Sequence, residues 1–511
     1  MQLDIKTCSR ARLTRDPRFD GRFFIGVMTT GIYCRPICPA RPPKEENVRY
    51  FPTAAAAAEA GLRPCLRCRP ESSPGTPAWL GTSTTVSRAL RLISESNLEP
   101  EDGKDGGMEA LAARLGIGSR HLRRLFLQHL GASPITVAQT RRIHFAKKLL
   151  DESRLPMRDI ALAAGFGSIR RFNATFLKTY GRSPSRLRKP NGRDGMMGED
   201  EYGFQLRFRP PYDWDSLLAF LAPRATPGIE AVENGAYRRT FLLHGHAGWL
   251  EVTCNAAASG LDLHVHYPQP QHLFLIIERV RRMFDLTADP EIIAAHLRRD
   301  PLLNGRVATK PGLRVPGCWD GFELAVRAIL GQQVTVRGAT TLAGRLVREF
   351  GTPLPDVKVA SGLTHLFPAP QQLADANLSR IGLPRARAHS IRSLACAVCE
   401  GKLSFAGVAD VEVFSKRLCE LPGIGSWTAQ YIAMRVLSEP DAFPAGDLGL
   451  LRAVGLKHVR ELESHAEAWR PWRAYAAMYL WQVNPKKGVS SHDYVLHKNG
   501  KSARPAVGGR R

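Results

Sequence analysis

The spacing of apolar residues changes character along the 511-residue chain. Residues 108–189 and about 306–495 repeat their apolar positions with the period of a helix. Residues 202–305 instead contain short runs in which apolar and polar positions alternate, and these runs predict strands. They are FQLRFR, YRRTFLL, WLEVTC and LDLHVHY, followed by the amphipathic helix HLFLIIERVRRMF. The pattern predicts a multidomain fold that is mainly α, with α+β parts.

Two polar, glycine-rich segments interrupt this pattern. EPEDGKDGG at 99–107 predicts a surface loop, and PNGRDGMMGEDE at 190–201 predicts a linker. The last residues, KSARPAVGGRR, are basic and we expect them to be disordered. We therefore expect five parts, which are residues 1–75, 80–190, 202–305, 306–495 and 496–511.

Four of the ten cysteines form two close pairs near the N-terminus. Cys34-x3-Cys38 is followed by Cys65-x2-Cys68, so two loops can supply four thiolates to a tetrahedral Zn²⁺. Cys8 lies outside this spacing, and we expect no role for it in the site. On spacing alone the site is a structural zinc knuckle. Five arginines nevertheless lie close to it in the sequence, namely Arg35, Arg41, Arg63, Arg67 and Arg69.

The stretch FFIGVMTTGIYCRPICPAR…RPCLRCRP resembles the N-terminal zinc domain of the Ada family of alkylation-response regulators. The resemblance covers nearly all of residues 1–70. It implies that Cys34 accepts a methyl group from a methyl phosphotriester in DNA. Nearby arginines, Arg35 most directly, can hold the flanking phosphates. Methylation makes the site less negative by one charge, so it should weaken repulsion from DNA and switch on transcription.

Residues 111–190 contain 17 Lys or Arg and only 3 Asp or Glu. MEALAARLGIGSRHLRRLFLQHLG and MRDIALAAGFGSIRRFNATFLKTYGRSP each hold an apolar helix, a glycine turn and a basic helix, which predicts two helix-turn-helix units. SPITVAQTRRIHFAKKLLDES is the expected linking helix. The GFGS…F…F…YGRSP ending resembles AraC-type domains, whose two recognition helices enter successive turns of the major groove. The candidate groove residues are Arg120, His121, Arg124, Ile169, Arg170, Arg171 and Asn173.

LPGIGSWTAQYIAMRVL predicts a helix-hairpin-helix, in which Gly423 and Gly425 let backbone amides approach a DNA phosphate. AFPAGDLGLLRAV follows, and its Asp447 is either a helix N-cap or a catalytic carboxylate. The hairpin followed by an aspartate resembles a DNA glycosylase superfamily. Lyase-type members carry a lysine where this chain has Trp427, which implies a monofunctional enzyme. The sequence holds no four-cysteine cluster after Asp447, so we expect no iron–sulfur site.

Residues 202–495 resemble AlkA-type 3-methyladenine DNA glycosylases in AVRAILGQQVTVRGA, in the hairpin and in WRPWRAYAAMYLWQ. The resemblance implies that aromatic rings bind a cationic alkylated purine that has left the base stack, and that Asp447 stabilises the oxocarbenium-like sugar and orients a water. The implied pocket residues are Trp427, Tyr431 and Trp481. The alternative is that Trp427 and Tyr431, one helical turn apart, are core aromatics.

One position departs from that family. Where the AlkA-type glycosylase inserts a leucine as a wedge into the DNA, this chain has Gln333, beside Gln332. Residues 202–305 match the family's N-terminal domain, and we expect them to be a scaffold without chemistry. The Pro-Cys-His-Arg motif of the Ada methyltransferase is absent from the sequence, so repair of O-alkylated guanine is not expected.

The net charge is +25, which favours nucleic acid or an anionic surface as partner. No apolar run is long enough to span a membrane, and MQLDIKTCSR lacks a signal-peptide core. We therefore expect a cytoplasmic, nucleoid-associated protein with reduced cysteines. Its expected partners are double-stranded DNA, at damaged and promoter sites, and RNA polymerase. We expect a monomer, because no dimerisation segment is recognisable.

The sequence thus favours an alkylation sensor, a transcription regulator and a DNA-3-methyladenine glycosylase in one chain. One alternative is a zinc-containing transcription regulator whose glycosylase domain is inactive. Another is a plain repair enzyme whose N-terminal half only tethers it to DNA.

Overall fold

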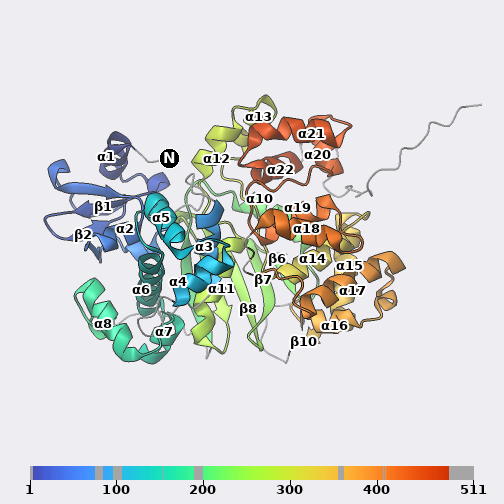
Figure 1. Cartoon of the computed structure of the whole chain (residues 1–511), viewed down its shortest axis with the longest axis horizontal. Coiled ribbons are helices and arrows are strands. Elements are labelled where there is room, and N and C mark those ends of the chain that lie inside the picture. The colour runs from blue at the N-terminus through green and yellow to red at the C-terminus, as the bar shows by residue number, and fades with distance from the viewer. Residues whose placement is uncertain are drawn as a thin grey trace, which may run out of the picture.

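The computed structural model describes residues 4–74, 84–95, 106–153, 155–188, 200–354, 362–406, 408 and 410–482. The expected tail at 496–511 and most of the expected linker at 190–201 lie outside these residues. Figure 1 shows the N-terminal part and the double helix-turn-helix on one side, the large sheet in the middle and the C-terminal helices on the other side. The expected multidomain fold, mainly α with α+β parts, is confirmed.

The N-terminal part is a small sheet flanked by helices. Its strand order is β3-β1-β2-β4, with β2 and β4 parallel and the other neighbours antiparallel. Because β2 ends at Cys34 and Tyr33 pairs with Pro64 of β4, the two cysteine pairs meet at one edge. The elements are α1 (Ile5–Thr14), β1 (Phe24–Val27), β2 (Ile32–Cys34), β3 (Val48–Phe51), α2 (Ala54–Glu59) and β4 (Arg63–Pro64).

Seven helices follow among the described residues, and they form the two expected helix-turn-helix units. They are α3 (Thr84–Glu95), α4 (Gly106–Arg114), α5 (Ser119–Leu130), α6 (Pro134–Glu152), α7 (Met157–Ala163), α8 (Ile169–Tyr180) and α9 (Pro184–Leu187). Most of the expected loop at 99–107 lies outside the described residues, and its last two residues are wrong, since Gly106 already begins α4. The recognition helices α5 and α8 both end at a left-handed glycine, Gly131 (φ +69°) and Gly181 (φ +68°), which suits a residue without Cβ.

The two units differ in what they pack against. The first has its own core with α3, in which Val86, Leu111 and Phe126 are buried together. The buried residues of the second, such as Leu149 and Phe172, form one continuous cluster with the sheet that follows. In packing terms, the second unit is therefore joined to the C-terminal half.

A five-stranded antiparallel sheet of order β5-β9-β8-β7-β6 fills the middle of the chain. Four of its strands were predicted by alternation, whereas the short β6 has no such pattern. The strands are β5 (Glu201–Arg207), β6 (Glu230–Glu233), β7 (Ala236–Leu243), β8 (His246–Asn255) and β9 (Gly260–His266). The accompanying helices are α10 (Trp214–Leu221), η4 (Ala222–Arg224), η6 (Pro270–His272), α11 (Leu273–Met283), α12 (Pro290–Leu297) and α13 (Pro301–Thr309).

The C-terminal part is helical, and it contains the predicted hairpin between α18 and α19. Its elements are α14 (Gly321–Leu330), α15 (Val336–Phe350), β10 (Thr352–Pro353), β11 (His365–Leu366), α16 (Pro370–Ala374), η7 (Leu378–Ile381), α17 (Arg385–Cys399), α18 (Val411–Glu420), α19 (Ser426–Val436), α20 (Leu448–Val454), α21 (Val459–Ala466), η8 (Glu467–Trp469) and α22 (Arg473–Trp481). Helices α14 and α22 are largely buried, and they position the neighbouring α19 and α20. Within the described residues, no helix combines the length and apolarity needed to cross a bilayer.

Candidate functional site

The four predicted zinc ligands converge. The Sγ atoms of Cys34, Cys38, Cys65 and Cys68 all lie within 4.8 Å of one another. A tetrahedral zinc site with Zn–S bonds of about 2.3 Å separates its sulfurs by roughly 3.8 Å, so the arrangement suits this ion. Two tight turns bring the sulfurs together, since the N–H of Cys38 donates to the carbonyl of Arg35 (3.1 Å) and the N–H of Arg69 to that of Cys65 (3.1 Å).

The chemistry of the donor set also fits a cation. The four thiols shift one another's pKa values through hydrogen bonds. The bond between Cys34 and Cys38 is the largest cause for both, since it raises the pKa of the Cys34 thiol and lowers the pKa of Cys38 to about 7. Four sulfurs this close repel one another as thiolates unless a cation lies between them. The described residues hold no other such group of His, Cys, Asp or Glu. These four cysteines are the residues that would hold the Zn²⁺ cofactor, whereas Cys8 is buried outside the cluster.

The two pairs differ in accessibility. Cys65 and Cys68 are 9% and 6% exposed, whereas Cys34 and Cys38 are intermediate. A large polymer such as DNA can therefore approach the site from the Cys34 side.

The expected phosphate contact of Arg35 does not fit the structure. Arg35 is only 5% exposed, and its guanidinium is ion-paired with Asp20, with an Nε–Oδ1 distance of 2.9 Å. It also donates to the carbonyl of Cys68 (3.0 Å), and its backbone N–H donates to the Cys68 sulfur (3.3 Å). Arg35 thus orients the zinc ligands. Of the five arginines that lie close to the cysteines in the sequence, Arg41, Arg63 and Arg67 are the exposed ones.

The candidate groove residues lie on the outer faces of the recognition helices. Leu122, Phe126, Phe172 and Phe176 form the buried faces of α5 and α8. All of the seven candidates are exposed, namely Arg120, His121, Arg124, Ile169, Arg170, Arg171 and Asn173. This exposure is what a major-groove contact requires, and the base contacts themselves stay a prediction.

Asp447 is the N-cap that the sequence offered as one of its two possible roles, and its carboxylate has further donors besides. It is the N-cap of α20, with Oδ1 accepting from the N–H of Leu450 at 3.0 Å. The same oxygen accepts from Nε1 of Trp481 at 3.0 Å, and Oδ2 accepts from Nε1 of Trp427 at 3.2 Å. The carboxylate is 7% exposed, so three donors hold a nearly buried anion in one orientation.

Two of the three predicted pocket aromatics contact this carboxylate, and the third packs against both of them. Trp427 and Tyr431 stack with ring centroids 5.5 Å apart and an interplanar angle of 9°, and Trp481 meets Tyr431 edge-on at 6.4 Å. All three rings are only partly buried, which favours the pocket over the core interpretation. An electron-rich wall beside a fixed anion is suited to a flat, cationic ligand.

Sequence reasoning missed two residues of this wall, which come from the part expected to be only a scaffold. The Phe220 ring of α10 lies 6.4 Å from that of Trp481, centroid to centroid, with an interplanar angle of 28°, and the Arg224 guanidinium lies 3.9 Å from the Phe220 ring centroid. Burial lowers the pKa of Arg224. Arg435 joins the group by donating to the Tyr431 hydroxyl at 2.7 Å. No local motif marks Phe220 or Arg224, because only the tertiary fold brings α10 to Trp481.

The hairpin needs glycine at Gly423, where φ is +77° and an added Cβ would lie 2.2 Å from Oγ of Ser390. Gly425 caps α19. Gln332 fastens a neighbouring loop to the hairpin, donating to the carbonyl of Gly423 at 2.9 Å. Gln333, the next residue, is exposed and has a left-handed backbone (φ +58°), a strained conformation for a residue other than glycine.

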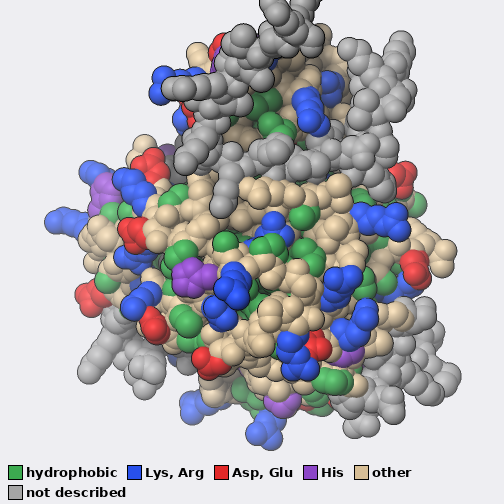
Figure 2. Space-filling model, turned by 90° about the vertical axis from the view of Figure 1, so that its right-hand side faces the viewer, with side chains coloured by type: hydrophobic (Ala, Val, Ile, Leu, Met, Phe, Trp, Pro, Cys, Tyr) green, Lys and Arg blue, Asp and Glu red, His purple; other side chains and the backbone are tan. Residues whose placement is uncertain are grey.

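The face of the molecule that bears the C-terminal helices is shown in Figure 2. Lys and Arg side chains are spread over its described surface, with fewer Asp and Glu between them. Positive charges that are spread over a surface in this way attract a polyanion even when they do not line one cleft.

Comparison with known proteins separates the chain into matching segments. Residues 7–71 match the model for the metal binding domain of Ada, residues 111–190 that for a helix-turn-helix domain, and residues 203–320 that for the AlkA N-terminal domain. A protein of Mycobacterium tuberculosis (strain CDC 1551 / Oshkosh), named probable bifunctional transcriptional activator/DNA repair enzyme AlkA, is 40% identical over 94% of this chain and 97% of its own length. The chain belongs to this bifunctional AlkA family.

Two relatives from Escherichia coli (strain K12) match the two halves of this AlkA-family chain separately. DNA-3-methyladenine glycosylase 2 is 35% identical, over 54% of this chain and 96% of its own length. The bifunctional transcriptional activator/DNA repair enzyme Ada is 34% identical, over 34% of this chain and 47% of its own length. The expected combination of an Ada-type sensor half, which we take as residues 4–188, and an AlkA-type half, residues 200–482, is confirmed.

Proposed function

We propose that this chain is a repair enzyme and a transcription regulator in one. Its AlkA-type half excises alkylated bases such as 3-methyladenine from double-stranded DNA by hydrolysis, and its Cys34 accepts methyl groups from DNA methyl phosphotriesters. The observation that supports this most strongly is the nearly buried Asp447 carboxylate, held by Trp427 and Trp481 beside stacked aromatic rings.

Base excision begins when the damaged nucleotide leaves the stack and its base enters the aromatic pocket. The base is already cationic, so it leaves as a neutral molecule when its bond to the sugar breaks, and little general-acid help is needed. The Asp447 carboxylate stabilises the positive charge that develops on the sugar and orients the attacking water. Water supplies the hydroxyl group and loses a proton, which completes hydrolysis.

The two indole N–H donors hold the Asp447 carboxylate in the orientation that its proposed role needs. Trp427 and Trp481 fix both oxygens of Asp447, so the anion is oriented before the substrate arrives. Trp427 also replaces the lysine of lyase-type enzymes, so this position offers no amine for a covalent intermediate. We therefore propose a monofunctional glycosylase with Trp427, Tyr431 and Trp481 as the base-binding wall.

Methyl transfer uses the exposed side of the cysteine cluster. Zinc, when bound, keeps the thiolates deprotonated at neutral pH. The Cys34 thiolate attacks the methyl carbon of the phosphotriester, the S–C bond forms as the C–O bond breaks, and a phosphodiester anion leaves. The product is a thioether, so each chain reacts once. The exposed Arg41, Arg63 and Arg67, rather than Arg35, are suited to hold the flanking phosphates.

We further propose that this transfer strengthens promoter binding, because the neutralised site repels DNA less. The exposed residues of α5 and α8 would read the promoter, and a monomer would contact RNA polymerase in the nucleoid of the cytoplasm. The division of the chain at 1–75, 80–190, 202–305, 306–495 and 496–511 also stays a proposal. Helix α13 (Pro301–Thr309) crosses the boundary between the parts 202–305 and 306–495, so the whole helix would belong to one of these two parts.

The rival proposal is a zinc-containing regulator with an inactive glycosylase domain. A base-release assay on methylated duplex DNA separates the two, using Asp447→Asn. Asparagine is as good an N-cap as aspartate, so the variant removes the charge and keeps the cap. The matched control is Asp410→Asn at the N-cap of α18, which accepts from the N–H groups of Glu412 and Val413.

We expect Asp447→Asn to lower the single-turnover rate of base release by about a thousandfold, as removal of electrostatic stabilisation does elsewhere. Asp410→Asn should leave the rate unchanged. Equal rates for the two variants, or no base release by the unmodified protein, would favour the inactive-domain alternative.

A further inference from the structure

The helix α6 contacts the zinc domain through residues that adjoin the zinc ligands. Tyr33, directly before Cys34, shares a hydrogen bond of 2.8 Å between its hydroxyl and Nε2 of His144. Arg69, directly after Cys68, forms an ion pair of 2.8 Å with Asp151. Both cysteine pairs are therefore tied to the same helix.

These contacts lie in a buried environment. The Tyr33 side chain is fully buried and that of Asp151 is 1% exposed. Burial lowers the pKa of His144 to about 4, so the imidazole is neutral at physiological pH and its bond to Tyr33 does not depend on protonation there. Because these contacts are buried, a displacement of either cysteine-bearing loop must either break them or move α6 with the loop.

Neighbouring residues of α6 contact the AlkA-type half. Phe145 meets Phe274 of α11 edge-on with ring centroids 4.9 Å apart. Lys148 donates to the carbonyl of Gln205 in β5 at 2.5 Å, and the N–H of Gln205 donates to Glu152 at 3.3 Å. Because the core of the second helix-turn-helix is continuous with the sheet, α6 is part of both halves.

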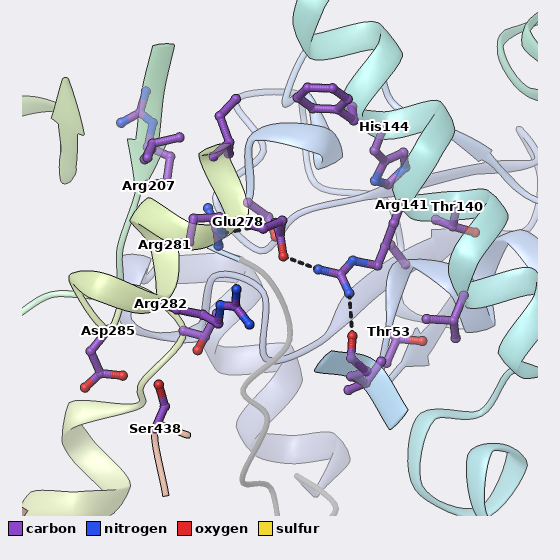
Figure 3. A pocket seen from close by; sticks show the side chains of 18 of the residues that line it. Thr53, Thr140, Arg141, His144, Arg207, Glu278, Arg281, Arg282, Asp285 and Ser438 are labelled. Atoms are coloured by element: carbon purple, nitrogen blue, oxygen red, sulfur yellow. Dashed lines mark hydrogen bonds and ion pairs between the residues drawn. The ribbon is translucent and has the colours of Figure 1, made fainter. Parts of the chain in front are cut away.

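A cavity of about 360 Å³ lies where α6, α11 and the zinc domain meet. Figure 3 shows His144 and Arg141 of α6 on one side of it and Glu278, Arg281 and Arg282 of α11 on the other, with the Arg141–Glu278 ion pair joining them. Protein interiors are otherwise close-packed, so this space lets α6 shift relative to α11 without a steric clash.

We propose that α6 transmits the state of the four-cysteine site to the AlkA-type half, so that the sensor and the glycosylase are energetically coupled. This inference rests on the proposed function only in that the event at the site is methylation of Cys34. Coupling between binding free energies is reciprocal, so DNA bound by the glycosylase also changes the affinity of the sensor half for DNA.

The test is hydrogen exchange of the full chain, read by mass spectrometry of peptides from α6, β5 and α11. One comparison is the zinc-loaded protein with and without a chelator. The other uses Tyr33→Phe, which removes only the hydroxyl that reaches His144. Its matched control is Tyr50→Phe in the same domain, whose hydroxyl donates to the exposed Glu45 at 2.8 Å and does not reach α6.

We expect Tyr33→Phe to speed exchange of α6 and α11 by about three- to tenfold, as loss of one buried hydrogen bond does, while Tyr50→Phe leaves both unchanged. Chelation should do the same in β5 and α11. Exchange that rises only within residues 4–74 would overturn the inference. So would equal behaviour of the two tyrosine variants with zinc bound.

A direct contact provides a further check. Arg22 of the zinc domain pairs with Asp289 and, at 3.2 Å, with Glu291 before and within α12, bypassing α6. If chelation changed exchange near α12 but not in α11 and β5, transmission would run through Arg22 and the role of α6 would be contradicted. Because the readout is exchange, it distinguishes this inference from the proposed function: coupling can hold when Cys34 accepts no methyl group, and it can fail when Cys34 does.

Discussion

Trp481 donates its indole N–H to the Asp447 oxygen that also caps α20, at 3.0 Å. The last helix described in the chain thus orients the carboxylate that begins a helix some thirty residues earlier. Replacement of Trp481 by Phe keeps a ring beside Tyr431 and removes this donor. We expect a fall of about tenfold in the single-turnover rate of base release, with a smaller effect on binding of damaged DNA, because the lost bond orients the carboxylate.

The control for this prediction is Trp472→Phe. Trp472 lies at the other end of α22, is 5% exposed and packs against Tyr475. It should affect the free energy of unfolding and leave the excision rate per folded molecule unchanged. A Trp481→Phe rate equal to that of the unmodified protein would show that the bonds from Trp427 and Leu450 suffice to orient Asp447.

Gln333 occupies the predicted wedge position in a left-handed, exposed conformation. In Gln333→Ala no side chain fills the gap left by the flipped nucleotide, so excision from a fully paired duplex should fall by about tenfold, because unstacking costs a few kcal/mol. The loss should be smaller when the damaged base is mispaired and easier to flip. A comparison of excision rates on the two substrates tests this, and equal losses on both would assign Gln333 another role.

Cys34 is predicted to be the methyl acceptor and Cys8 an uninvolved core residue. Cys34→Ser should abolish transfer from methyl phosphotriester DNA, even in the fraction of protein that retains zinc by metal analysis, because serine is not ionised at neutral pH. Cys8→Ala, which alters a residue that is 3% exposed, should transfer normally. Transfer to the Cys34→Ser protein would move the acceptor to Cys38, the other partly exposed ligand.

Arg170 is exposed at the start of α8 and is predicted to contact a base edge. Arg170→Ala should weaken promoter binding by about 1–3 kcal/mol and relax sequence preference at one position. Arg380→Ala, a change of the same charge at a side chain 65% exposed in the AlkA-type half, should leave promoter affinity unchanged. Quantitative footprinting on promoter variants measures both, and uniform weakening on every sequence would indicate a phosphate contact.

Asp285 is a source of pH-dependent stability. Burial raises its pKa to about 6, although it accepts from the Tyr475 hydroxyl at 2.7 Å. A raised folded-state pKa means that its contribution is fully present below the unfolded pKa and is lost as pH rises through about 6. Asp285→Asn should therefore raise the free energy of unfolding at neutral pH by about 3 kcal/mol. Denaturant titrations of both proteins should show this difference shrinking as the pH falls below the folded pKa, and a constant difference would contradict it.

Local motifs made much of the functional site predictable from the sequence. Cys34-x3-Cys38, the hairpin glycine Gly423 and Asp447 each lie in a short stretch whose spacing reflects backbone geometry or ligand geometry. Asp447 was predicted to be either a cap or a catalytic group, and the structure gives it the cap together with two indole donors.

Residues that depend on distant partners were not predictable. Arg35 is expected at a phosphate by its position beside Cys34, yet it is buried against Asp20, and the sequence does not mark that pairing. Phe220 and Arg224 reach the aromatic group beside Asp447 from more than two hundred residues away. The dual contacts of α6 also arise from tertiary packing, because periodicity marks a buried face without naming what covers it.

The proposal that one chain accepts methyl groups and excises bases is tested most directly by a single reaction. Zinc-loaded protein is incubated with duplex DNA carrying isotope-labelled methyl groups on both phosphates and bases, and mass spectrometry then follows the label. We predict one labelled methyl group on the peptide that contains Cys34, together with free labelled 3-methyladenine that Asp447→Asn fails to release. Label on neither product, with zinc bound and the chain folded, would contradict the proposal.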